Sequence, residues 1–254
     1  MITRQAANRS RPDGGGRGAA MAPPLRVPAE CAWALDSLYR LQRSGAPRRP
    51  QALARYVSAA YADELGRFLA PVRARARNCS GPRLRVVDIG AGLAMYHAAL
   101  DRDLGGCVEH FLVDKSANEV PAERPEQHGG WHPHRLPFYN SMECARRIAR
   151  ASGIDGARWH GLNASAAAIV RLGPRSVDVA MSLLSCGFHY PVSAYAAAVA
   201  KVLKPEGFFV VTLRRGMRQE EALREAGFRC VDGGKWAQSA KGALLACRVR
   251  GASS

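Results

Sequence analysis

The sequence predicts an α/β protein built on an open, doubly wound, mostly parallel sheet of seven strands. From residue 81 onward, short apolar runs typical of buried strands alternate with segments whose apolar residues recur at three- and four-residue steps, as on a helix. The last two runs, 228–231 and 243–249, have only a glycine pair and a polar stretch between them. This spacing predicts an antiparallel hairpin that closes one edge of the sheet.

The expected elements follow one another along the chain. The runs that predict strands are 84–89, 110–113, 157–162, 177–184, 208–213, 228–231 and 243–249. The segments that predict helices are 94–101, 141–152, 164–172, 192–203 and 219–226. This alternation places helices on both faces of the sheet.

The first 80 residues predict a different organisation. Residues 1–28 are rich in Arg, Gly and Pro and poor in large apolar side chains, so this segment is expected to be a disordered tail. It is either an organelle transit peptide or a stretch that precedes a true start at Met21. Residues 29–80 are expected to form a helical cap, with an apolar stripe between 51 and 76. The α/β domain then takes residues 81–254.

Composition narrows the class of protein. The chain of 254 residues is 47% hydrophobic and 23% charged, as in a globular protein. It has no apolar run near the roughly 18 to 20 residues of a membrane span and no secretory signal, so a cytoplasmic protein without a membrane is expected. The seven cysteines are spread singly, without a C-x-x-C pair. They predict neither a disulfide framework nor a cysteine zinc site, and a reducing compartment is the default.

The charge balance leaves two interpretations open. The chain has 37 Lys and Arg against 21 Asp and Glu, a net charge of +16. Clustered arginines could bind the phosphates of a nucleic acid. Alternatively, the arginines reflect a compositional bias over the whole chain and form no binding surface.

Residues 86–94 contain the motif that predicts a ligand-binding site. A hydrophobic strand ends in Asp88, and Gly90 and Gly92 then lead into a helix. In open parallel sheets the ligand crevice lies at the carboxyl ends of the strands. Glycines there allow positive φ and a close approach of the backbone to a ligand, and the helix N-terminus adds free amides.

The neighbours of the two glycines indicate the type of ligand. A dinucleotide fold would carry a third glycine where Met95 stands. A carboxylate two residues before the first glycine would face a pyrophosphate in such a fold. Asp88 suits instead a cationic group, such as the α-amino group of a methionine moiety.

Asp88-Ile89-Gly90-Ala91-Gly92 resembles the D-x-G-x-G signature of class I S-adenosylmethionine-dependent methyltransferases. The similarity extends from about residue 83 to residue 249. It includes a second strand that ends in Asp114, and a segment 203–208 that resembles the L-K-P-G-G turn of the family. The sequence departs from the family where Glu206 replaces the first glycine of that turn, and where Ala94 stands in place of a third glycine.

The resemblance implies a Rossmann-like fold and S-adenosyl-L-methionine as the cofactor. Asp88, Gly90 and Gly92 would lie at the cofactor, and Asp114 would hold its ribose hydroxyls. Asn163, at the end of the third strand, would lie at the adenine edge. A helix N-cap is the alternative role for Asn163.

The segment 182–191 is expected to lie beside the sulfonium and the methyl acceptor. It lacks the N-P-P-Y and D-P-P-Y elements of enzymes that methylate nucleobase amines. His189 is the candidate base, since an alcohol becomes a good nucleophile only as its proton leaves. Tyr190 and Ser185 are expected to line the acceptor pocket. Alternatively, His189 only caps a loop against Tyr190.

The loop 115–140 is long for a compact α/β unit, which favours a functional segment. We expect it to cover the substrate with aromatic contacts, Trp131 among them. Its histidines also permit a metal interpretation, but Gly129, Gly130 and Pro133 forbid the helix that would align them. No metal is therefore expected.

The leading hypothesis is methyl transfer to an oxygen of a small-molecule or sugar-like acceptor. The stretch 187–192 is similar to a short stretch of sugar O-methyltransferases. An RNA methyltransferase that uses the basic surface is the second hypothesis, motivated by the net charge of +16. A non-catalytic member of the fold that binds cofactor or a partner protein is the third. The acceptor and the oligomeric state are left open.

Overall fold

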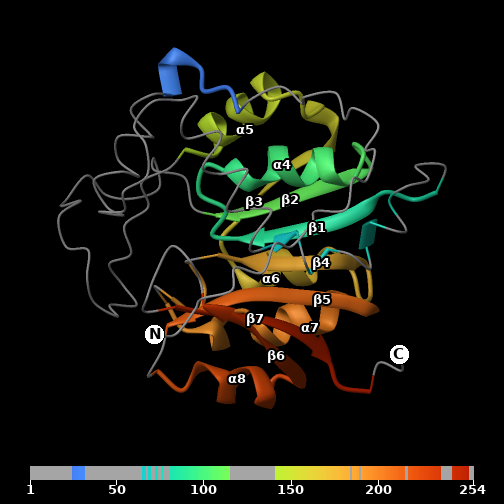
Figure 1. The fold of residues 1–254 in the computed structure, drawn as a ribbon, viewed down its shortest axis with the longest axis vertical. Coiled ribbons are helices and arrows are strands. Elements are labelled where there is room, and N and C mark those ends of the chain that lie inside the picture. Colours follow the sequence, from blue (N-terminus) through green and yellow to red (C-terminus); the bar gives the residue numbers. More distant parts are fainter. Residues whose placement is uncertain are drawn as a thin grey trace, which may run out of the picture.

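The computed structural model describes residues 25–31, 65–66, 68–69, 72–73, 76, 81–114, 141–183, 185–188, 190–214, 217–235 and 242–251. The described chain forms one seven-stranded sheet in the order β3-β2-β1-β4-β5-β7-β6 (Figure 1). The strands are β1 Leu84–Ile89, β2 Val108–Asp114, β3 Trp159–Asn163, β4 Val177–Ser182, β5 Leu203–Arg214, β6 Phe228–Lys235 and β7 Gly242–Val249.

Strand direction confirms the predicted fold class. β1 to β5 run parallel, and β7 runs antiparallel to both β5 and β6. The first strand, β1, lies in the middle of the sheet. The strands that follow extend through β2 to β3, and β4 then pairs with the other side of β1. In such a sheet the strand order reverses between β1 and β4, so the ligand crevice is expected at their carboxyl ends.

Helices cover both faces of the sheet (Figure 1). On one face lie α4 Met95–Asp103 and α5 Met142–Ala151; on the other lie α6 Ala166–Val170, α7 Ala196–Val202 and α8 Gln219–Glu225. Three short 3-10 helices complete the described elements: η1 Ala29–Cys31, η4 Gly156–Arg158 and η5 Val192–Ala194.

Two of the predicted helices are shorter than expected because local capping decides where they begin. The hydroxyl of Ser165 accepts a hydrogen bond from Ala168 N, at 3.1 Å, and so caps α6. Ser165 is therefore the N-cap, and the alternative role proposed for Asn163 is wrong. Likewise α7 begins at Ala196, after the separate turn of η5.

Alternating sides of β1 face two separate cores. Val87 and Ile89 pack in the cluster that contains α7, whereas Val86 packs in the cluster that contains α4. Leu65, Leu69 and Val72, which belong to the predicted stripe of the cap, are buried in this second cluster against β1, β4 and β5. The described part of the stripe therefore packs on the sheet as an amphipathic face should. The domain boundaries remain predictions.

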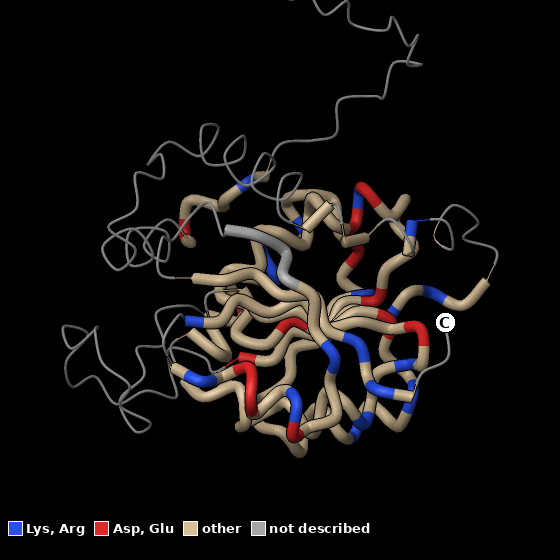
Figure 2. Tube along the Cα trace, turned by 60° about the horizontal axis from the view of Figure 1, so that its bottom comes forward, with Lys and Arg blue, Asp and Glu red and all other residues tan. Residues whose placement is uncertain are grey.

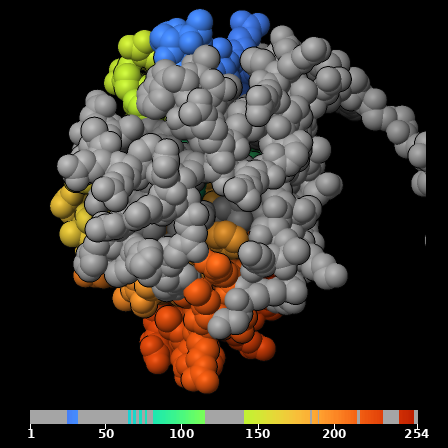
Figure 3. All heavy atoms as spheres, turned by 90° about the vertical axis from the view of Figure 1, so that its left-hand side faces the viewer, coloured from blue at the N-terminus to red at the C-terminus, as the bar shows by residue number. Residues whose placement is uncertain are grey.

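The end of the tail predicted to be disordered is packed. Leu25 is buried against α5, and Arg26 N donates a hydrogen bond to Ser152 Oγ at 3.0 Å. Residues 25–31, blue in Figures 1 and 3, lie beside the yellow-green α5. The prediction of disorder is thus wrong for residues 25–28, and residues 1–24 lie outside the described part of the chain.

The expectation that the chain encodes no disulfides is also wrong. Cys31 is bonded to Cys144, over a sequence separation of 113 residues, and Cys230 is bonded to Cys247 across the β6–β7 pair. Cys107 is disulfide-bonded as well, and among the described residues Cys186 is the free cysteine. The spacing of the cysteines along the sequence could not predict these pairs, because each cysteine stands alone and only folding brings the two partners together.

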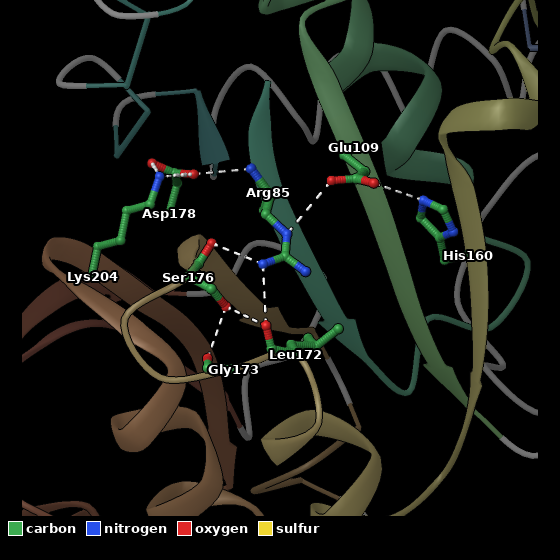
Figure 4. A network of polar contacts seen from close by, with 8 residues as sticks. All are labelled: Arg85, Glu109, His160, Leu172, Gly173, Ser176, Asp178 and Lys204. Carbon is green, nitrogen blue, oxygen red and sulfur yellow. Dashed lines mark hydrogen bonds and ion pairs between the residues drawn. The ribbon is translucent and has the colours of Figure 1, made fainter. Parts of the chain in front are cut away.

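Charged side chains tie the strands together at the amino end of the sheet (Figure 4). The buried Asp178 carboxylate of β4 accepts hydrogen bonds from Arg85 N in β1 and from Lys204 Nζ in β5, both at 2.9 Å. Arg85 also pairs with Glu109, which in turn contacts His160 at 2.9 Å. This end is held by ion pairs, whereas the opposite end carries the glycine turn.

None of the helices in the described ranges is long and apolar enough to cross a membrane. The cytoplasmic location stays a prediction.

Candidate active site

The turn after β1 has the backbone that its glycines predict. Gly90 has φ +73° and Gly92 has φ +57°, both in the left-handed region. Gly90 N donates a hydrogen bond to Val113 O at 2.7 Å, which joins the turn to the end of β2. Ala94, the N-cap of α4, also has a positive φ of +52° and caps the helix with no side-chain hydrogen bond. The first amides of α4 are thus not satisfied by a capping side chain.

The second predicted carboxylate lies directly at this turn. Asp114 ends β2 and is nearly buried, and its Oδ2 accepts a hydrogen bond from Gly92 N at 2.7 Å. Parallel pairing of β1 with β2 brings the ends of both strands to the same edge of the sheet. Sequence reasoning placed Asp114 and Gly92 at one site, and the structure joins them by a hydrogen bond.

The segment after β4 rests on the first glycine. Ser182 Oγ donates a hydrogen bond to Ile89 O at 2.8 Å and accepts one from Cys186 N at 2.9 Å, so this segment is anchored to the end of β1. A Cβ added to Gly90 would collide with the side chain of Ser185 and lie 3.4 Å from the Tyr190 hydroxyl. Both predicted pocket residues therefore lie at the turn.

Ser185 and Tyr190 form a hydroxyl pair with a defined protonation state. Ser185 Oγ donates a hydrogen bond to Tyr190 OH at 3.1 Å. Burial raises the pKa of Tyr190 well above its ordinary value. The phenol therefore keeps its proton near neutral pH, so it can donate a hydrogen bond but cannot serve as a base.

Cys186, in the same segment, has an environment that makes its thiol unreactive. Its side chain is fully buried, and burial raises the pKa of the thiol. A nucleophilic cysteine needs a lowered pKa and access to a ligand. Cys186 therefore packs in the core rather than reacting.

Asn163 lies where sequence analysis placed it, at the carboxyl end of β3. It is paired in register with Asp114 and its side chain is exposed. Hence β1, β2, β3 and β4 each bring a polar or glycine position to the same edge of the sheet.

Asp88 occupies a more enclosed position than the sequence indicated. Its side chain is only 8% exposed, and its Oδ2 lies 2.9 Å from His97 Nε2 on α4. Its Oδ1 makes no hydrogen bond within the described part of the chain. One carboxylate oxygen of Asp88 therefore faces α4.

Sequence reasoning missed the side chains behind Asp88. His97 and Asp101 lie four residues apart on α4, and His110 and Arg158 complete a buried polar cluster. The signal was present, because His97 and Asp101 flank the apolar residues 98–100 on a helix that must pack on the sheet. Nothing in the sequence indicated which strand residues would meet them.

The remaining predicted site residues lie outside the described part of the chain. These are His189, the candidate base, and Trp131, together with the histidines of the loop 115–140. Within the described ranges, no group of three or more His, Cys, Asp or Glu side chains could hold a metal ion.

No protein-family model matches the chain, and none of the curated proteins matches it. Among solved structures, an O-methyltransferase family protein from Burkholderia thailandensis matches at 14% identity and a TM-score of 0.46. The match covers 76% of this chain and 59% of that protein, so the chain spans less than two thirds of its length.

Two further structures are similar. The ribosomal protein L11 methylase of Lactobacillus delbrueckii subsp. bulgaricus matches at 14% identity and a TM-score of 0.46, over 71% of this chain and 76% of that one. The [4+2]-cyclase SpnF matches at 13% identity and a TM-score of 0.48, over 90% of this chain and 98% of that one. These are likenesses of fold.

The strand order and strand directions of the described chain are those of the α/β fold expected from its sequence, including the C-terminal antiparallel hairpin. The turn after β1 also has the positive-φ glycines that its D-x-G-x-G resemblance implies.

Proposed function

We propose that the chain is an S-adenosylmethionine-dependent methyltransferase that methylates an oxygen of a small-molecule or sugar-like acceptor. The observation that supports this most is the contact of Asp114 with Gly92 N at 2.7 Å. It places a carboxylate, a side-chain-free turn and a helix N-terminus at one point on the carboxyl edge of the sheet.

The residues at this edge fit the proposed cofactor. Among the described residues, no atom lies within 4 Å of a Cβ built on Gly92. Asp88 would take the α-ammonium group of the methionine moiety, Asp114 the ribose hydroxyls, and Asn163 the adenine edge. When bound, S-adenosylmethionine supplies an electrophilic methyl group on a sulfonium.

The protein would contribute mainly alignment. An in-line displacement needs the acceptor oxygen, the methyl carbon and the sulfur at contact distance and in one line. The Tyr190 phenol, which keeps its proton, would donate a hydrogen bond to the acceptor. An alcohol also needs a base within reach, and we assign that role to His189.

Calorimetry with S-adenosylmethionine and with its demethylated product tests the cofactor. Wild type is expected to bind both, and Asp114→Ala is expected to bind roughly 10- to 100-fold more weakly, because it loses hydrogen bonds to a charged group. Glu109→Gln is the matched control, since Glu109 lies at the amino end of the same strand. Absence of binding by wild type would remove the proposal.

Incubation of a cell extract with the protein and an isotopically labelled methyl donor tests the acceptor. We expect the label in a small hydroxylated compound, and we expect His189→Ala to slow its incorporation. Label in RNA, with an affinity that falls steeply with salt, would favour the nucleic-acid alternative. That alternative draws on the exposed Arg229 and Arg248, which lie directly opposite each other on β6 and β7, and on the basic residues near the C-terminus in Figure 2.

A further inference from the structure

A row of basic side chains lies along the amino end of the sheet, opposite the glycine turn. β1, β4 and β5 run parallel, so their first residues lie at the same edge. β7 runs antiparallel to β5, and β6 antiparallel to β7, so the last residues of β7 and the first residues of β6 continue that edge. The exposed bases on it are Arg83, Arg175, Lys201, Arg229, Arg248 and Arg250. We call these six side chains the basic edge.

Backbone contacts link neighbours on the basic edge. Arg175 N donates a hydrogen bond to Lys201 O at 3.2 Å, and Arg250 N donates one at 2.7 Å to the carbonyl group of the residue before β6. Arg229 and Arg248 are directly paired in the register of β6 with β7. In Figure 2 the blue segments gather on the side of the molecule where the C-terminus lies.

The basic edge is unpaired within the described part of the chain. None of its six side chains forms an ion pair with a described carboxylate, including the exposed Glu206 of β5. By contrast, the exposed Arg146 and Arg147 of α5 both pair with Glu143. A compositional bias towards arginine explains the bases on both surfaces, but it does not explain this difference in pairing.

Two local features of the basic edge are unfavourable in the isolated chain. Arg229 and Arg248 place like charges directly opposite each other on neighbouring strands, which destabilises a sheet. Arg175 has a φ of +50°, a left-handed conformation that is unfavourable for a residue with a Cβ and is typical of functional positions. The dipole of α7 favours a cation at Lys201, but it does not act on the bases of β6 and β7. The arrangement therefore fits a surface that binds an anionic partner.

The dimensions of the basic edge fit a nucleic-acid duplex. The row crosses β1, β4, β5, β7 and β6, and a spacing of about 4.8 Å between strands gives it a length of roughly 20 Å. A duplex carries one phosphate charge per roughly 1.7 Å of its axis, so it presents on the order of ten phosphates over that length. All the bases but Lys201 are arginines, whose planar guanidinium groups bind phosphate oxygens through two hydrogen bonds.

Other anionic partners fit this surface less well. A single strand binds largely by stacking its bases on aromatic side chains. A membrane surface takes up apolar side chains such as Trp, Phe and Leu in addition to bases. The exposed large apolar side chains of the described chain are Met217 and Val231, and neither is aromatic. Contacts on the basic edge are therefore expected to be with phosphates alone.

We propose that the basic edge docks the phosphate backbone of a double-stranded nucleic acid, irrespective of its base sequence. β1 has six residues at about 3.3 Å each, so the basic edge lies roughly 20 Å from the glycine turn. A duplex segment held there lies away from the proposed site of methyl transfer, so this contact anchors the duplex and does not present a methyl acceptor. The inference goes beyond the proposed function and does not rest on it.

Fluorescence anisotropy with the full chain and a labelled duplex of about 20 base pairs tests the docking without any cofactor. RNA and DNA duplexes are expected to bind with similar affinity, since only phosphates are contacted. The affinity should fall roughly 1,000-fold between about 50 and 200 mM salt, as for six phosphate contacts. No binding at about 50 mM salt, or an affinity that salt does not change, would overturn the inference.

Removal of two charges tests whether the basic edge makes these contacts. Arg229→Gln/Arg248→Gln is expected to weaken duplex binding roughly 10-fold or more, and to make the slope of log K against log salt shallower by about 2. The control Arg146→Gln/Arg150→Gln removes the same charge from the exposed face of α5 and should bind as wild type does. Equal losses in both variants would overturn the inference, because binding would then follow total charge.

Arg175→Gln changes a separate part of the basic edge, before β4, and should make the slope shallower by about 1. It keeps the test decisive if the β6–β7 variant does not fold. Cosedimentation with phosphatidylserine vesicles tests a membrane as the partner. Vesicle binding that is lost in Arg229→Gln/Arg248→Gln, with duplex binding unchanged, would overturn the inference. None of these measurements uses S-adenosylmethionine, so their failure leaves the proposed function intact, and absence of cofactor binding leaves the docking intact.

Discussion

The two glycines of the turn after β1 are needed for different physical reasons. Both have positive φ, but a Cβ at Gly90 would collide with Ser185, whereas a Cβ at Gly92 would meet no atom of the described residues within 4 Å. Gly92→Ala therefore carries only the penalty of a left-handed alanine, about 1 to 2 kcal/mol. Gly90→Ala adds a steric penalty, because the colliding atoms include the Cβ of Ser185, which cannot rotate away.

We predict that Gly90→Ala lowers the free energy of unfolding by more than Gly92→Ala does, as measured by denaturant unfolding. In the double variant Gly90→Ala/Ser185→Gly, part of this loss should be recovered. Equal losses in the two single variants would show that Ser185 does not press on the turn.

Ala94 occupies the position at which many class I methyltransferases have a third glycine. Its φ of +52° is unfavourable for alanine. We predict that Ala94→Gly leaves the free energy of unfolding nearly unchanged, because relief of this conformation offsets the greater freedom of glycine in the unfolded chain. The control Ala98→Gly, within α4, should lose about 1 kcal/mol. Equal losses at both positions would contradict the left-handed conformation of Ala94.

At the scale of single elements, α4 and β2 are joined by buried histidines that make the fold sensitive to acid. Burial lowers the pKa of His110 to about 4, below the ordinary value of 6.5. Because the pKa is lower in the folded state, the unfolded chain takes up the proton first as the pH falls. The contribution of neutral His110 to stability is therefore fully present above pH 6.5 and is lost between pH 6.5 and about pH 4.

We predict a loss on the order of 3 kcal/mol from this group over that interval. Urea unfolding at a series of pH values measures it, and His110→Gln should have a shallower slope than wild type. His160→Gln, which changes a half-exposed histidine on β3, should keep the wild-type slope. A wild-type slope in His110→Gln would contradict the neutral state of His110.

At the scale of the whole molecule, the disulfides connect segments that are far apart in the chain. The Cys31–Cys144 bond closes a loop over 113 residues, and the Cys230–Cys247 bond closes one over 17. Because these bonds restrict the unfolded chain, they are expected to raise the free energy of unfolding by about 4 to 5 kcal/mol and about 3 kcal/mol, respectively.

We predict that Cys31→Ser/Cys144→Ser destabilises the protein more than Cys230→Ser/Cys247→Ser does. The first variant should also make the segment 25–31 more accessible to limited proteolysis, because the disulfide is then lost and the described contacts that remain are the packing of Leu25 and Val27, the Arg26 N–Ser152 Oγ hydrogen bond and the exposed Arg147–Glu30 ion pair. Peptide mapping without reduction should recover both linked pairs. Recovery of all four cysteines as free thiols would contradict the two bonds.

The sequence alone determined the order of strands and helices, the antiparallel hairpin and the glycine turn, because these features depend on periodicity and on residues adjacent in the chain. The resemblance to the methyltransferase family placed Asp114 at the same site as the turn, and the parallel pairing of β1 with β2 brings the two together. Only the tertiary structure decided that Ser185 rests on Gly90, that His97 and His110 stand behind Asp88, and that Cys31 pairs with Cys144. These contacts join residues far apart in the chain, and no local pattern encodes which distant side chain will fill a given space.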